Sequence, residues 1–590
     1  MEYRSSKEQR RRRRRRKKIL QAVIPVGVAV ILIGVIGVVS FKSGLFEDWG
    51  YSSEKADLNS YFRVVSADEA TVVRDNEVSD EKIKVKDDHL YLNLEQVDEQ
   101  LNSNFYYEET SGRLLYTTGD GVYTVSPNED RYSLNGQATQ LGYNACYKEG
   151  DNLMVALDYV KIFTDFEADL FGGSGEPYRC EIKTTWGNDV VADVEKDEVA
   201  IRDKADKEGK ILKEVRKGAT VKIVASENEN WMKVMTDDLI TGYIENKHIG
   251  ESYERPETPV TGAKAINVST VADYSKPLVL AWHNVTTKDS AGFLDDYSKY
   301  LGDINTISPT WFALADNEGT IASIASTAYV SKCHEKGLKV WGLVDNMTYP
   351  DVSTFTVMSD PDKRAHVISQ LLSLASEYSL DGINVDFENL TKDAGPHFVQ
   401  FVRELSLEAH KQNLVISVDN YVPQGYTMHY DRKTQGNFVD YVIIMGYDEH
   451  TSASEEAGSV ASLDFVLNGI EETLKDVPAN KVVNALPFYT RYWSVDSAGA
   501  IAEMQTLSMA KGKETVDAAG AEVKWDDETG QNYAEWTADG LTKKIWLEDE
   551  DSLKAKVDVM SSHNIGGVAV WQLAYSTEMG WAVINDTYKP

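Results

Sequence analysis

Short apolar runs recur along the chain from about Asn267 to its end, and each run is four to seven residues long. The runs are separated by longer stretches in which apolar positions recur every three or four residues, the pattern of helices that cover one face of a sheet. Strands that alternate with helices predict a parallel α/β architecture. The expected strands are Leu278–Trp282, Thr306–Phe312, Lys339–Leu343, Gly382–Phe387, Val415–Val418, Tyr441–Met445, Val482–Leu486 and Gly567–Trp571.

Eight such strands in about 320 residues fit a (β/α)8 TIM barrel over residues 267–590. The clearest helix precedes the fourth strand, where Val367, Ile368, Leu371, Leu372, Ala375 and Tyr378 follow a helical period. The distance between the seventh and eighth strands is too long for one helix. An insertion is therefore expected at about residues 493–547.

The first 41 residues have a different pattern. Residues 1–18 hold eleven Lys or Arg against two Glu, and residues 19–41 hold no charged residue. As a helix, this apolar stretch spans about 34 Å, enough to cross a bilayer. A cleaved secretory signal is the alternative, but no small-residue cleavage site follows, which favours a membrane anchor. The positive-inside rule then predicts a cytoplasmic tail at 1–18 and an extracellular chain beyond residue 42, in a single-pass protein of the cell membrane.

A polar stalk is expected at residues 42–58, and a β-rich region follows at 59–185. This region contains a faint repeat with an offset of 63 residues: Asp88-His89-Leu90, Leu94 and Val97 match Asp151-Asn152-Leu153, Leu157 and Val160. Each copy predicts a short strand that runs into a helical turn. The region resembles the N-terminal domain of copper amine oxidases, which implies a small α+β module with a structural role and no copper.

Residues 194–252 predict a separate small unit of short strands and turns. Val199–Arg202, Gly218–Val221, Trp231–Val234 and Gly242–Ile244 are its apolar segments. Their order resembles a bacterial SH3-like β-barrel, in which we expect Trp231 to be a core residue. Residues 253–266, with Pro256 and Pro259, are predicted as a linker.

Charge and cysteine content exclude several classes of function. The net charge is −33, and because the tail carries +9, the remainder carries −42. A chain that carries so large a negative charge beyond its tail does not bind nucleic acid through general electrostatics. Cys146, Cys180 and Cys333 are too few for a disulfide framework, although Cys146 and Cys180 are candidates for a pair. No Cys/His spacing indicates a metal site.

The segment Asp381-Gly382-Ile383-Asn384-Val385-Asp386-Phe387-Glu388 carries the clearest chemistry. Strand side chains alternate between faces, so Asn384, Asp386 and Glu388 project to one side, about 6–7 Å apart. Polar groups on a buried face are costly unless they bind each other or a ligand. A Glu with an Asp two residues before it is suited to holding a proton near neutral pH.

Three motifs in this order resemble glycoside hydrolase family 18, the chitinase and N-acetylglucosaminidase family. The segment above is similar to its Asp-Gly-x-Asp-x-Asp-x-Glu signature, with Asn384 in place of the middle Asp. Met445-Gly446-Tyr447-Asp448 resembles its Met-x-Tyr-Asp motif, and the strand ending at Trp571 resembles its eighth strand. The resemblance implies an α+β character for the insertion. Asn384 followed by Asp-Phe-Glu-Asn is similar to the branch that acts on spore cortex and peptidoglycan fragments.

The resemblance implies substrate-assisted retaining hydrolysis with no cofactor and no metal. Glu388 is then the general acid, Asp386 binds the acetamido N–H of the sugar, and Tyr447 binds its acetamido oxygen. Because Asn384 cannot ionise, we expect the pKa of Asp386 to be lower than it is beside an Asp. The implied sugar-binding residues are Trp571, Asn384, Asp448, Tyr489 and Trp311, of which Tyr489 and Trp311 are as plausible as packing residues.

These observations predict a membrane-anchored extracellular glycosidase whose substrate is an N-acetylglucosamine-containing polysaccharide, most plausibly peptidoglycan. A chitinase or an endo-β-N-acetylglucosaminidase on other glycans is an alternative within the enzymes. A wall-glycan-binding scaffold without turnover is the alternative from another class.

Overall fold

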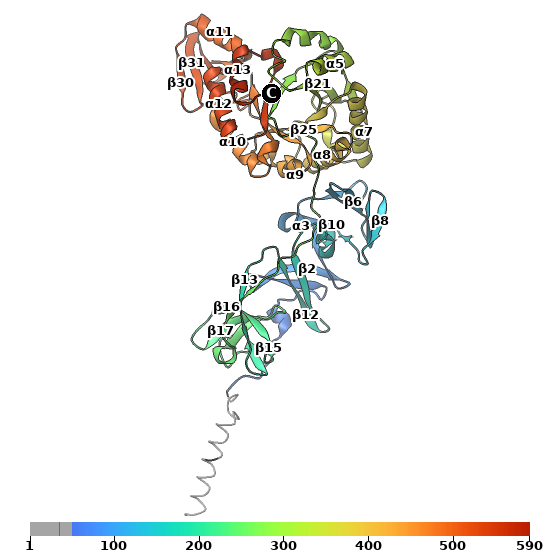
Figure 1. The fold of residues 1–590 in the computed structure, drawn as a ribbon. Helices are drawn as coiled ribbons and strands as arrows, with labels where there is room; N and C mark the ends of the chain where they lie inside the picture. Colours follow the sequence, from blue (N-terminus) through green and yellow to red (C-terminus); the bar gives the residue numbers. More distant parts are fainter. Residues whose placement is uncertain (1–34, 36–49) are drawn as a thin grey trace, which may run out of the picture. The chain divides into compact units, whose positions relative to one another are not determined.

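The computed structural model describes Val35 and residues 50–590, which form two compact units (Figure 1). Unit 1 contains the described residues up to Tyr91 together with Asp165–Gly262, and unit 2 contains Leu92–Thr164 together with Ala263–Pro590. The predicted tail 1–18, and the predicted span 19–41 apart from Val35, lie outside the described residues. In the part of the chain that the structure describes, no helix has the length and hydropathy needed to cross a bilayer.

A closed barrel forms most of unit 2. Within residues 278–571, eight parallel strands pair in chain order, and the last strand pairs with the first. The predicted (β/α)8 barrel is confirmed, and each predicted strand overlaps one of these. They are β20 (Leu278–His283), β21 (Thr306–Leu314), β23 (Lys339–Asp345), β24 (Gly382–Asp386), β25 (Val415–Tyr421), β26 (Tyr441–Met445), β27 (Val482–Pro487) and β33 (Gly567–Trp571).

Barrel closure depends on a glycine at the start of β33. Gly567 pairs with Leu278 of β20 on one side and with Val483 of β27 on the other. A Cβ atom at Gly567 would lie 2.2 Å from the carbonyl oxygen of Leu278. Only glycine allows so close an approach of the two backbones.

Helices surround the barrel strands (Figure 1). The helix predicted before the fourth strand is α7 (Pro361–Tyr378), which buries Val367, Ile368, Leu371 and Ala375. Asp360 caps its N-terminus, and Pro361 occupies the first helical position, where a missing N–H costs nothing. The other helices are α5 (Thr327–Glu335), α6 (Thr354–Met358), α8 (Gly395–His410), α9 (Arg432–Phe438), α10 (Leu463–Leu474), α12 (Glu550–Ser562) and α13 (Glu578–Thr587).

The strand side chains divide between two apolar layers because they alternate in direction. One layer fills the barrel and includes Leu280, Trp282, Trp341 and Ile443. The other lies between the strands and the helices, where Ile307, Val340, Ile383 and Val442 belong to a single large cluster. This division decides which side chains reach the barrel interior.

A separate antiparallel sheet lies between β27 and β33, where the insertion is expected, and its first strand begins at Tyr489. Its five strands have the order β29-β28-β32-β31-β30, with helix α11 (Met509–Ala519) packed on β28, β29 and β32. Glu548, just after the last of these strands, forms a fully buried ion pair with Lys556 of α12 at 2.6 Å. The strands are β28 (Tyr489–Val495), β29 (Ile501–Ser508), β30 (Val523–Asp526), β31 (Gln531–Ala538) and β32 (Leu541–Leu547).

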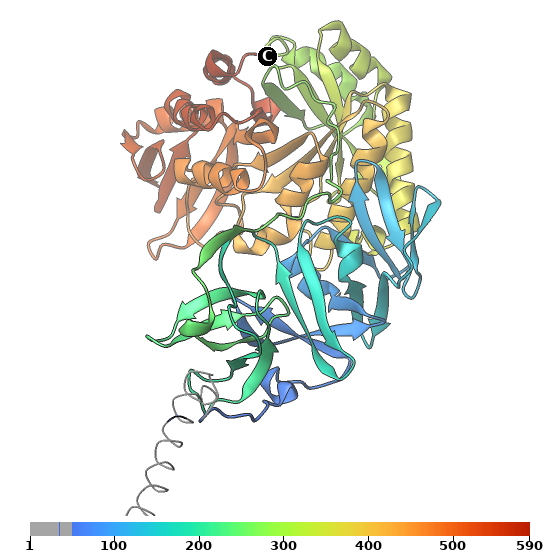
Figure 2. The same ribbon diagram turned by 60° about the horizontal axis from the view of Figure 1, so that its bottom comes forward.

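Residues 92–164 belong to the same unit as the barrel. Their antiparallel sheet has the order β4-β5-β6-β7-β8, and it lies beside the barrel helices in Figure 2. The faint repeat corresponds to two strand–helix pairs, β3 (His89–Asn93) with α3 (Leu94–Gln100) and β10 (Asn152–Ala156) with α4 (Leu157–Val160). The remaining strands are β4 (Phe105–Glu108), β5 (Arg113–Thr118), β6 (Gly121–Val125), β7 (Arg131–Leu134), β8 (Gln137–Gln140) and β9 (Cys146–Glu149).

Unit 1 contains two β-structures. The first pairs β1 with β2 and β12, and β12 with β11. The second has the order β15-β14-β18-β17-β16-β13-β19 and covers the predicted SH3-like unit, with Trp231 buried as expected. The strands are β1 (Glu69–Arg74), β2 (Glu77–Lys86), β11 (Glu167–Gly173), β12 (Glu176–Lys183), β13 (Asn188–Asp193), β14 (Val199–Arg202), β15 (Ile211–Val215), β16 (Thr220–Ser226), β17 (Trp231–Met235), β18 (Thr241–Glu245) and β19 (Tyr253–Pro256).

Two details differ from the expectations or add to them. The segment predicted as a linker at 253–266 begins with β19, which pairs with β13 because that edge strand offers unpaired backbone groups. The three cysteines are free and buried, and burial raises the pKa of the Cys146 and Cys180 thiols to about 12. Cys146 and Cys180 lie in different units and form no disulfide.

Candidate active site

A cleft of about 620 Å³ lies where the carboxyl ends of β24, β25 and β26 meet. In a barrel of this kind the loops at this end of the strands carry the reactive side chains. Of the predicted site residues, Glu388, Tyr447 and Asp448 line the cleft. The other lining residues include Asn389, Tyr421, Gln424, Tyr426, His429, Glu449 and Thr451.

Glu388 lies two residues beyond the end of β24, where its side chain is half-buried. The Tyr421 hydroxyl, from the end of β25, donates to its Oε2 at 2.5 Å. Burial raises the pKa of Glu388, and the nearby carboxylates of Asp448 and Asp345 raise it further, against the hydrogen bond from Tyr421. A carboxyl group in this environment is suited to donating a proton near neutral pH.

Asp386 is the residue before Glu388 on the same face of β24. Its Oδ1 atom is buried and has no hydrogen-bond partner. Burial, and after it the charges of Asp419, Glu388 and Asp345, raise the pKa of Asp386 well above its usual range. A buried acceptor without a partner is costly, so this oxygen is available to a ligand donor.

Asn384 lies deeper in the barrel and is fully buried. Its Oδ1 accepts from Trp282 Nε1 at 2.8 Å and from Ser308 Oγ at 3.1 Å. Its Nδ2 donates to Ser417 Oγ at 3.0 Å and to Asp419 Oδ1 at 2.9 Å. These four bonds use the full capacity of an amide side chain. The structure therefore gives Asn384 a role in holding four strands together and leaves it no group for a sugar.

The expected effect of Asn384 on Asp386 changes once Asp419 is taken into account. We expected a lower pKa at Asp386 because position 384 carries no charge. Asp419 of β25 is 2% exposed, and its charge raises the pKa of Asp386. Asp419 on β25 thus supplies the like charge that Asn384 on β24 lacks.

Tyr447 and Asp448 follow β26, and Tyr489 begins β28 of the insertion. The rings of Tyr447 and Tyr489 meet edge to face, with centroids 6.2 Å apart. Asp448 Oδ1 accepts from the Tyr489 hydroxyl and from Arg491 Nη2, both at 2.5 Å. Asp448 is held by these two bonds and has a left-handed backbone, with φ of 59°. The insertion thus holds Asp448, which lines the cleft.

The two predicted tryptophans lie in different places. Trp571, at the end of β33, is half-buried, and its ring centroid lies 6.2 Å from that of Trp282. Trp311 is 3% exposed and packs edge to face on Tyr329 of α5 at 5.0 Å. Ser308 points into the barrel, whereas Trp311, at the register shift between Thr310 and Phe312, packs in the cluster between the strands and the helices. Of the two roles expected for Trp311, its burial favours packing, and a sugar contact stays a prediction.

Sequence reasoning missed three residues of the site. Tyr421 and Asp419 lie on β25, at alternate positions after Ser417, so inward periodicity along that strand was a usable signal. Asn346 follows β23, and its amide bonds the backbone of Glu388, a contact that no local pattern predicts. Within residues 50–590, no cluster of His, Cys, Asp and Glu has the arrangement of a metal site.

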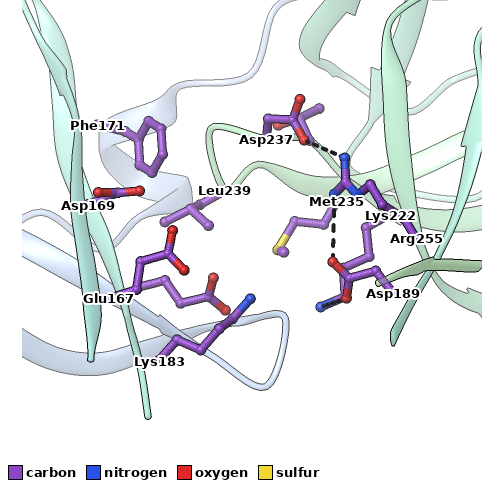
Figure 3. A pocket seen from close by; sticks show the side chains of 12 residues that line it. Glu167, Asp169, Phe171, Lys183, Asp189, Lys222, Met235, Asp237, Leu239 and Arg255 are labelled. Carbon is purple, nitrogen blue, oxygen red and sulfur yellow. Dashed lines mark ion pairs between the residues drawn. The ribbon is translucent and has the colours of Figure 1, made fainter. Parts of the chain in front are cut away.

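A second cavity, of about 180 Å³, lies in unit 1 between β11 and β12 on one side and β16, β17 and β19 on the other (Figure 3). Its cations are paired within the protein: Lys222 binds Asp189 at 2.8 Å, and Arg255 lies 3.6 Å from the same carboxylate. Lys183 binds Glu257 at 2.6 Å. None of the predicted catalytic residues lines this cavity.

Comparison with known families matches two parts of the chain. The family model described as "Glycosyl hydrolases family 18" matches residues 225–575, more than half of the chain. The model described as "Bacterial SH3 domain" matches residues 197–250. The resemblance of residues 59–185 to the copper amine oxidase domain stays a prediction.

Individual relatives are similar over about half of the chain. The "Uncharacterized glycosylase YvbX" of Bacillus subtilis is 27% identical over 319 residues, which cover 52% of this chain and 90% of that protein. The "Cortical fragment-lytic enzyme" of the same organism is 24% identical and is covered over 58% of its length, against 42% of this chain. The crystal structure of the Bacillus cereus spore cortex-lytic enzyme SleL superposes with a TM-score of 0.49 at 16% identity, covering 58% of this chain and 78% of that one.

The buried carboxyl groups predict a pH-dependent cost in stability. Burial raises the pKa of Asp419 well above that of an unfolded-chain Asp, about 3.9. The folded state therefore loses stability as the pH rises above about 4, by about 1.4 kcal/mol for each unit of pKa elevation. We expect Asp419→Asn, which can still accept from Asn384, to unfold at higher urea than the wild type at pH 7 and at equal urea near pH 4. Asp351→Asn, at an exposed position, is the matched control. If the wild type and Asp419→Asn unfolded at the same urea concentration at every pH, the raised pKa of Asp419 would be contradicted.

Proposed function

We propose that this chain, which belongs to family 18 of the glycosyl hydrolases and is a glycosidase, cleaves β-linked N-acetylglucosamine in cell-wall peptidoglycan by substrate-assisted retaining catalysis. The observation that carries the mechanism is the state of the carboxylates around Glu388. Glu388 is the carboxyl group that lines the cleft with a raised pKa. The neighbouring carboxylates are held by hydrogen bonds or enclosed in the barrel.

A retaining glycosidase with a carboxylate nucleophile needs a second free carboxylate about 5–5.5 Å from the acid. Asp448 is bonded to Tyr489 and Arg491. Asp345 accepts from the backbone N–H groups of Met347 and Thr348 at 2.8 and 2.7 Å. Asp419 is buried in the barrel. Asp386 remains, but it precedes Glu388 on the same strand face and does not oppose it. This arrangement favours a nucleophile supplied by the substrate.

In the proposed first step, the carboxylic acid of Glu388 gives its proton to the glycosidic oxygen as the bond from this oxygen to the anomeric carbon breaks. The acetamido oxygen of the same sugar forms a bond to that carbon, which yields an oxazolinium ion. The unpartnered Oδ1 of Asp386 accepts the acetamido N–H and offsets the positive charge. Tyr447 donates to the acetamido oxygen and aligns it.

In the second step, the Glu388 carboxylate takes a proton from water as the water oxygen attacks the anomeric carbon. The oxazolinium ring opens, the acetamido group is restored, and the sugar keeps its configuration. Trp571 offers an apolar face to the sugar ring. The chemistry needs only groups of the protein and the substrate.

The choice of peptidoglycan rests on two kinds of support. Relatives of this chain carry names that refer to the spore cortex, such as the "Cortical fragment-lytic enzyme". The chain also carries a bacterial SH3 domain match beside the barrel. Chitin and glycoprotein glycans are the alternative substrates, and a binding scaffold is the alternative without turnover.

The general acid is tested with Glu388→Gln in the full chain. Loss of proton transfer lowers the rate by about 10²–10⁴-fold. The wild type and the variant are incubated with purified peptidoglycan and with chitooligosaccharides, and the products are identified by mass spectrometry. We expect the wild type to release peptidoglycan fragments with reducing N-acetylglucosamine and the variant to release almost none. Glu408→Gln, on the exposed face of α8, is the control; release of chitooligosaccharide products alone would favour a chitinase, and binding without release would favour the scaffold.

The hydrogen bond from Tyr421 predicts a shift in the pH profile. It lowers the pKa of Glu388, so Tyr421→Phe raises that pKa. Because Glu388 must be protonated to act as the acid, the falling limb of kcat/KM at high pH should move to higher pH. Tyr378→Phe, at the end of α7, should leave the limb in place. An unchanged high-pH limb in Tyr421→Phe would mean that the ionisation of Glu388 does not determine this limb.

We also propose that the chain is anchored in the cell membrane by residues 19–41, with residues 1–18 in the cytoplasm and both units outside. The support is the uncharged stretch preceded by a strongly basic tail. Protease added to intact cells should degrade the barrel while sparing an epitope tag placed at the N-terminus. Survival of the barrel in intact cells, with degradation after lysis, would reverse the proposed orientation.

A further inference from the structure

The backbone of Glu388 has no strand partner. The ladder between β23 and β24 ends with the pair Asp345 and Asp386, and Glu388 lies beyond it. The next residue, Asn389, turns the chain with a left-handed backbone, with φ of 52°. Without a further contact, the main chain that carries the general acid would be held by loops alone.

Asn346 supplies that contact from the end of β23. Its Oδ1 accepts from the Glu388 backbone N–H at 2.8 Å, and its Nδ2 donates to the Glu388 carbonyl oxygen at 2.9 Å. The side-chain amide thus replaces the next pair of ladder hydrogen bonds. The second Nδ2 proton goes to Thr354 Oγ1 at 2.9 Å, at the first residue of α6. The position of Asn346 therefore depends on α6.

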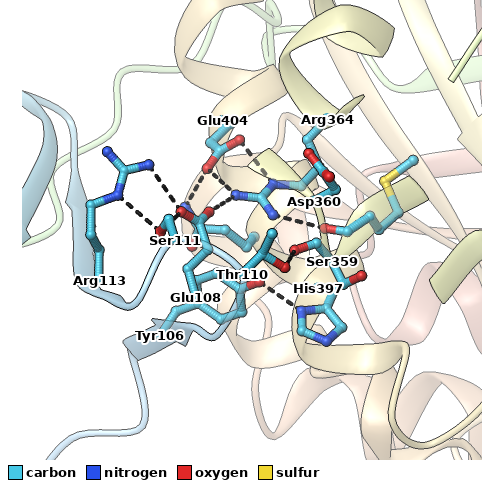
Figure 4. Close-up of polar contacts among 12 residues, drawn as sticks. Tyr106, Glu108, Thr110, Ser111, Arg113, Ser359, Asp360, Arg364, His397 and Glu404 are labelled. Carbon is cyan, nitrogen blue, oxygen red and sulfur yellow. Dashed lines mark hydrogen bonds and ion pairs between the residues drawn. The ribbon is translucent and has the colours of Figure 1, made fainter. Parts of the chain in front are cut away.

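Helix α6 is held by the β4–β5 hairpin (105–118), which is distant in sequence (Figure 4). Thr110, at the tip of this hairpin, donates to the carbonyl oxygen of Ser359, the C-cap of α6, at 3.2 Å. Arg364 donates to the carbonyl oxygen of Met358, the last residue of α6, at 2.8 Å. Both bonds satisfy carbonyl groups that the end of a helix leaves without partners.

The hairpin also fixes Arg364. Figure 4 shows its guanidinium between the carboxylates of Glu108 and Glu404. Arg364 and Glu108 are each 1% exposed, so their ion pair is held in a low-dielectric environment. Beside them, the Tyr106 hydroxyl bonds His397 Nδ1 at 2.6 Å, and the ring of Phe355 in α6 packs on His397 at 5.2 Å.

We propose that Asn346 is a positioning residue for the general acid and that the β4–β5 hairpin keeps it in place through α6. The β-rich segment before the SH3-like domain is then part of the catalytic unit, because its hairpin supports the loop that holds the acid. The role of Asn346 depends on the proposed role of Glu388. Misplacement of a catalytic group by about 1 Å can cost about 10²-fold in rate.

The test uses the full chain and two substrates that differ in their need for an acid. Soluble glycan chains from peptidoglycan have a poor leaving group, which needs a proton. The dinitrophenyl β-glycoside of N-acetylglucosamine releases dinitrophenolate, which leaves without a proton. For Asn346→Ala, we expect kcat on the glycan to fall about 10- to 100-fold with KM changed less than about 2-fold. On the dinitrophenyl glycoside, kcat/KM, which reports the first step before Glu388 acts as a base, should fall less than about 3-fold, as it should for Glu388→Gln.

The hairpin is tested with Glu108→Gln, alone and combined with Asn346→Ala. The single variant should lower kcat on the glycan about 3- to 10-fold, and the double variant should be no slower than Asn346→Ala within about 2-fold, because both changes act through one contact. Thr110→Ala serves in place of Glu108→Gln if that variant does not fold. Glu109→Gln, an exposed neighbour in the same turn, should behave as the wild type.

Each outcome has a separate meaning. A normal kcat in Asn346→Ala beside an inactive Glu388→Gln overturns the inference and leaves the proposed function standing. Full activity in Glu388→Gln overturns both. Equal losses on the two substrates in Asn346→Ala would mean a general structural defect and would also overturn the positioning role. Hairpin variants that unfold more easily but keep the wild-type kcat, or double variants with additive losses, overturn the role of the hairpin.

Discussion

The barrel encloses two carboxyl groups, Asp386 and Asp419, with no cation bonded to either of them among the described residues. Two like charges at such a site cannot both ionise at low cost, so the pair retains a proton that two exposed carboxyls would lose. Asn384 makes the arrangement tolerable because its amide donates to Asp419 while it binds Trp282, Ser308 and Ser417. The amide thus ties four strands around the carboxyl pair. The electrostatic state of the site follows from this buried network.

Glu388 differs from this pair because it lies beyond the end of its strand, so contacts outside the strand must hold it at the cleft. Tyr421 holds its carboxyl group and Asn346 holds its backbone, each from a neighbouring strand. Asp448 is held on the far wall by Tyr489 and Arg491 of the insertion. The site is therefore preorganised by contacts between segments that are far apart in sequence, as catalysis by electrostatic preorganisation requires.

Much of the fold was predictable because its signals are local. Each barrel strand is an apolar run between helical stretches, and α7 carries its own cap in Asp360 and Pro361. The motif residues Glu388, Asp386 and Tyr447 were also predictable, because each lies at the end of a strand or within two residues of it. The direction of Trp311 was not predictable because β21 has a register shift between Thr310 and Phe312, which interrupts the alternation of its side chains. The strand at the start of the predicted linker was missed because β19 forms only where β13 offers it an edge.

The sequence alone determined the order of the elements, the acidic body, and the set of side chains able to perform acid catalysis on a sugar. Those properties follow from periodicity, composition and residue chemistry within short windows. Only the tertiary structure decided that Asp419 would take the place of the missing charge at position 384, that Asn384 would be saturated by its neighbours, and that Asn346 and a distant hairpin would support Glu388. The physical reason is that hydrogen bonding and charge interaction depend on distance in space, and barrel closure brings together residues that no local pattern relates.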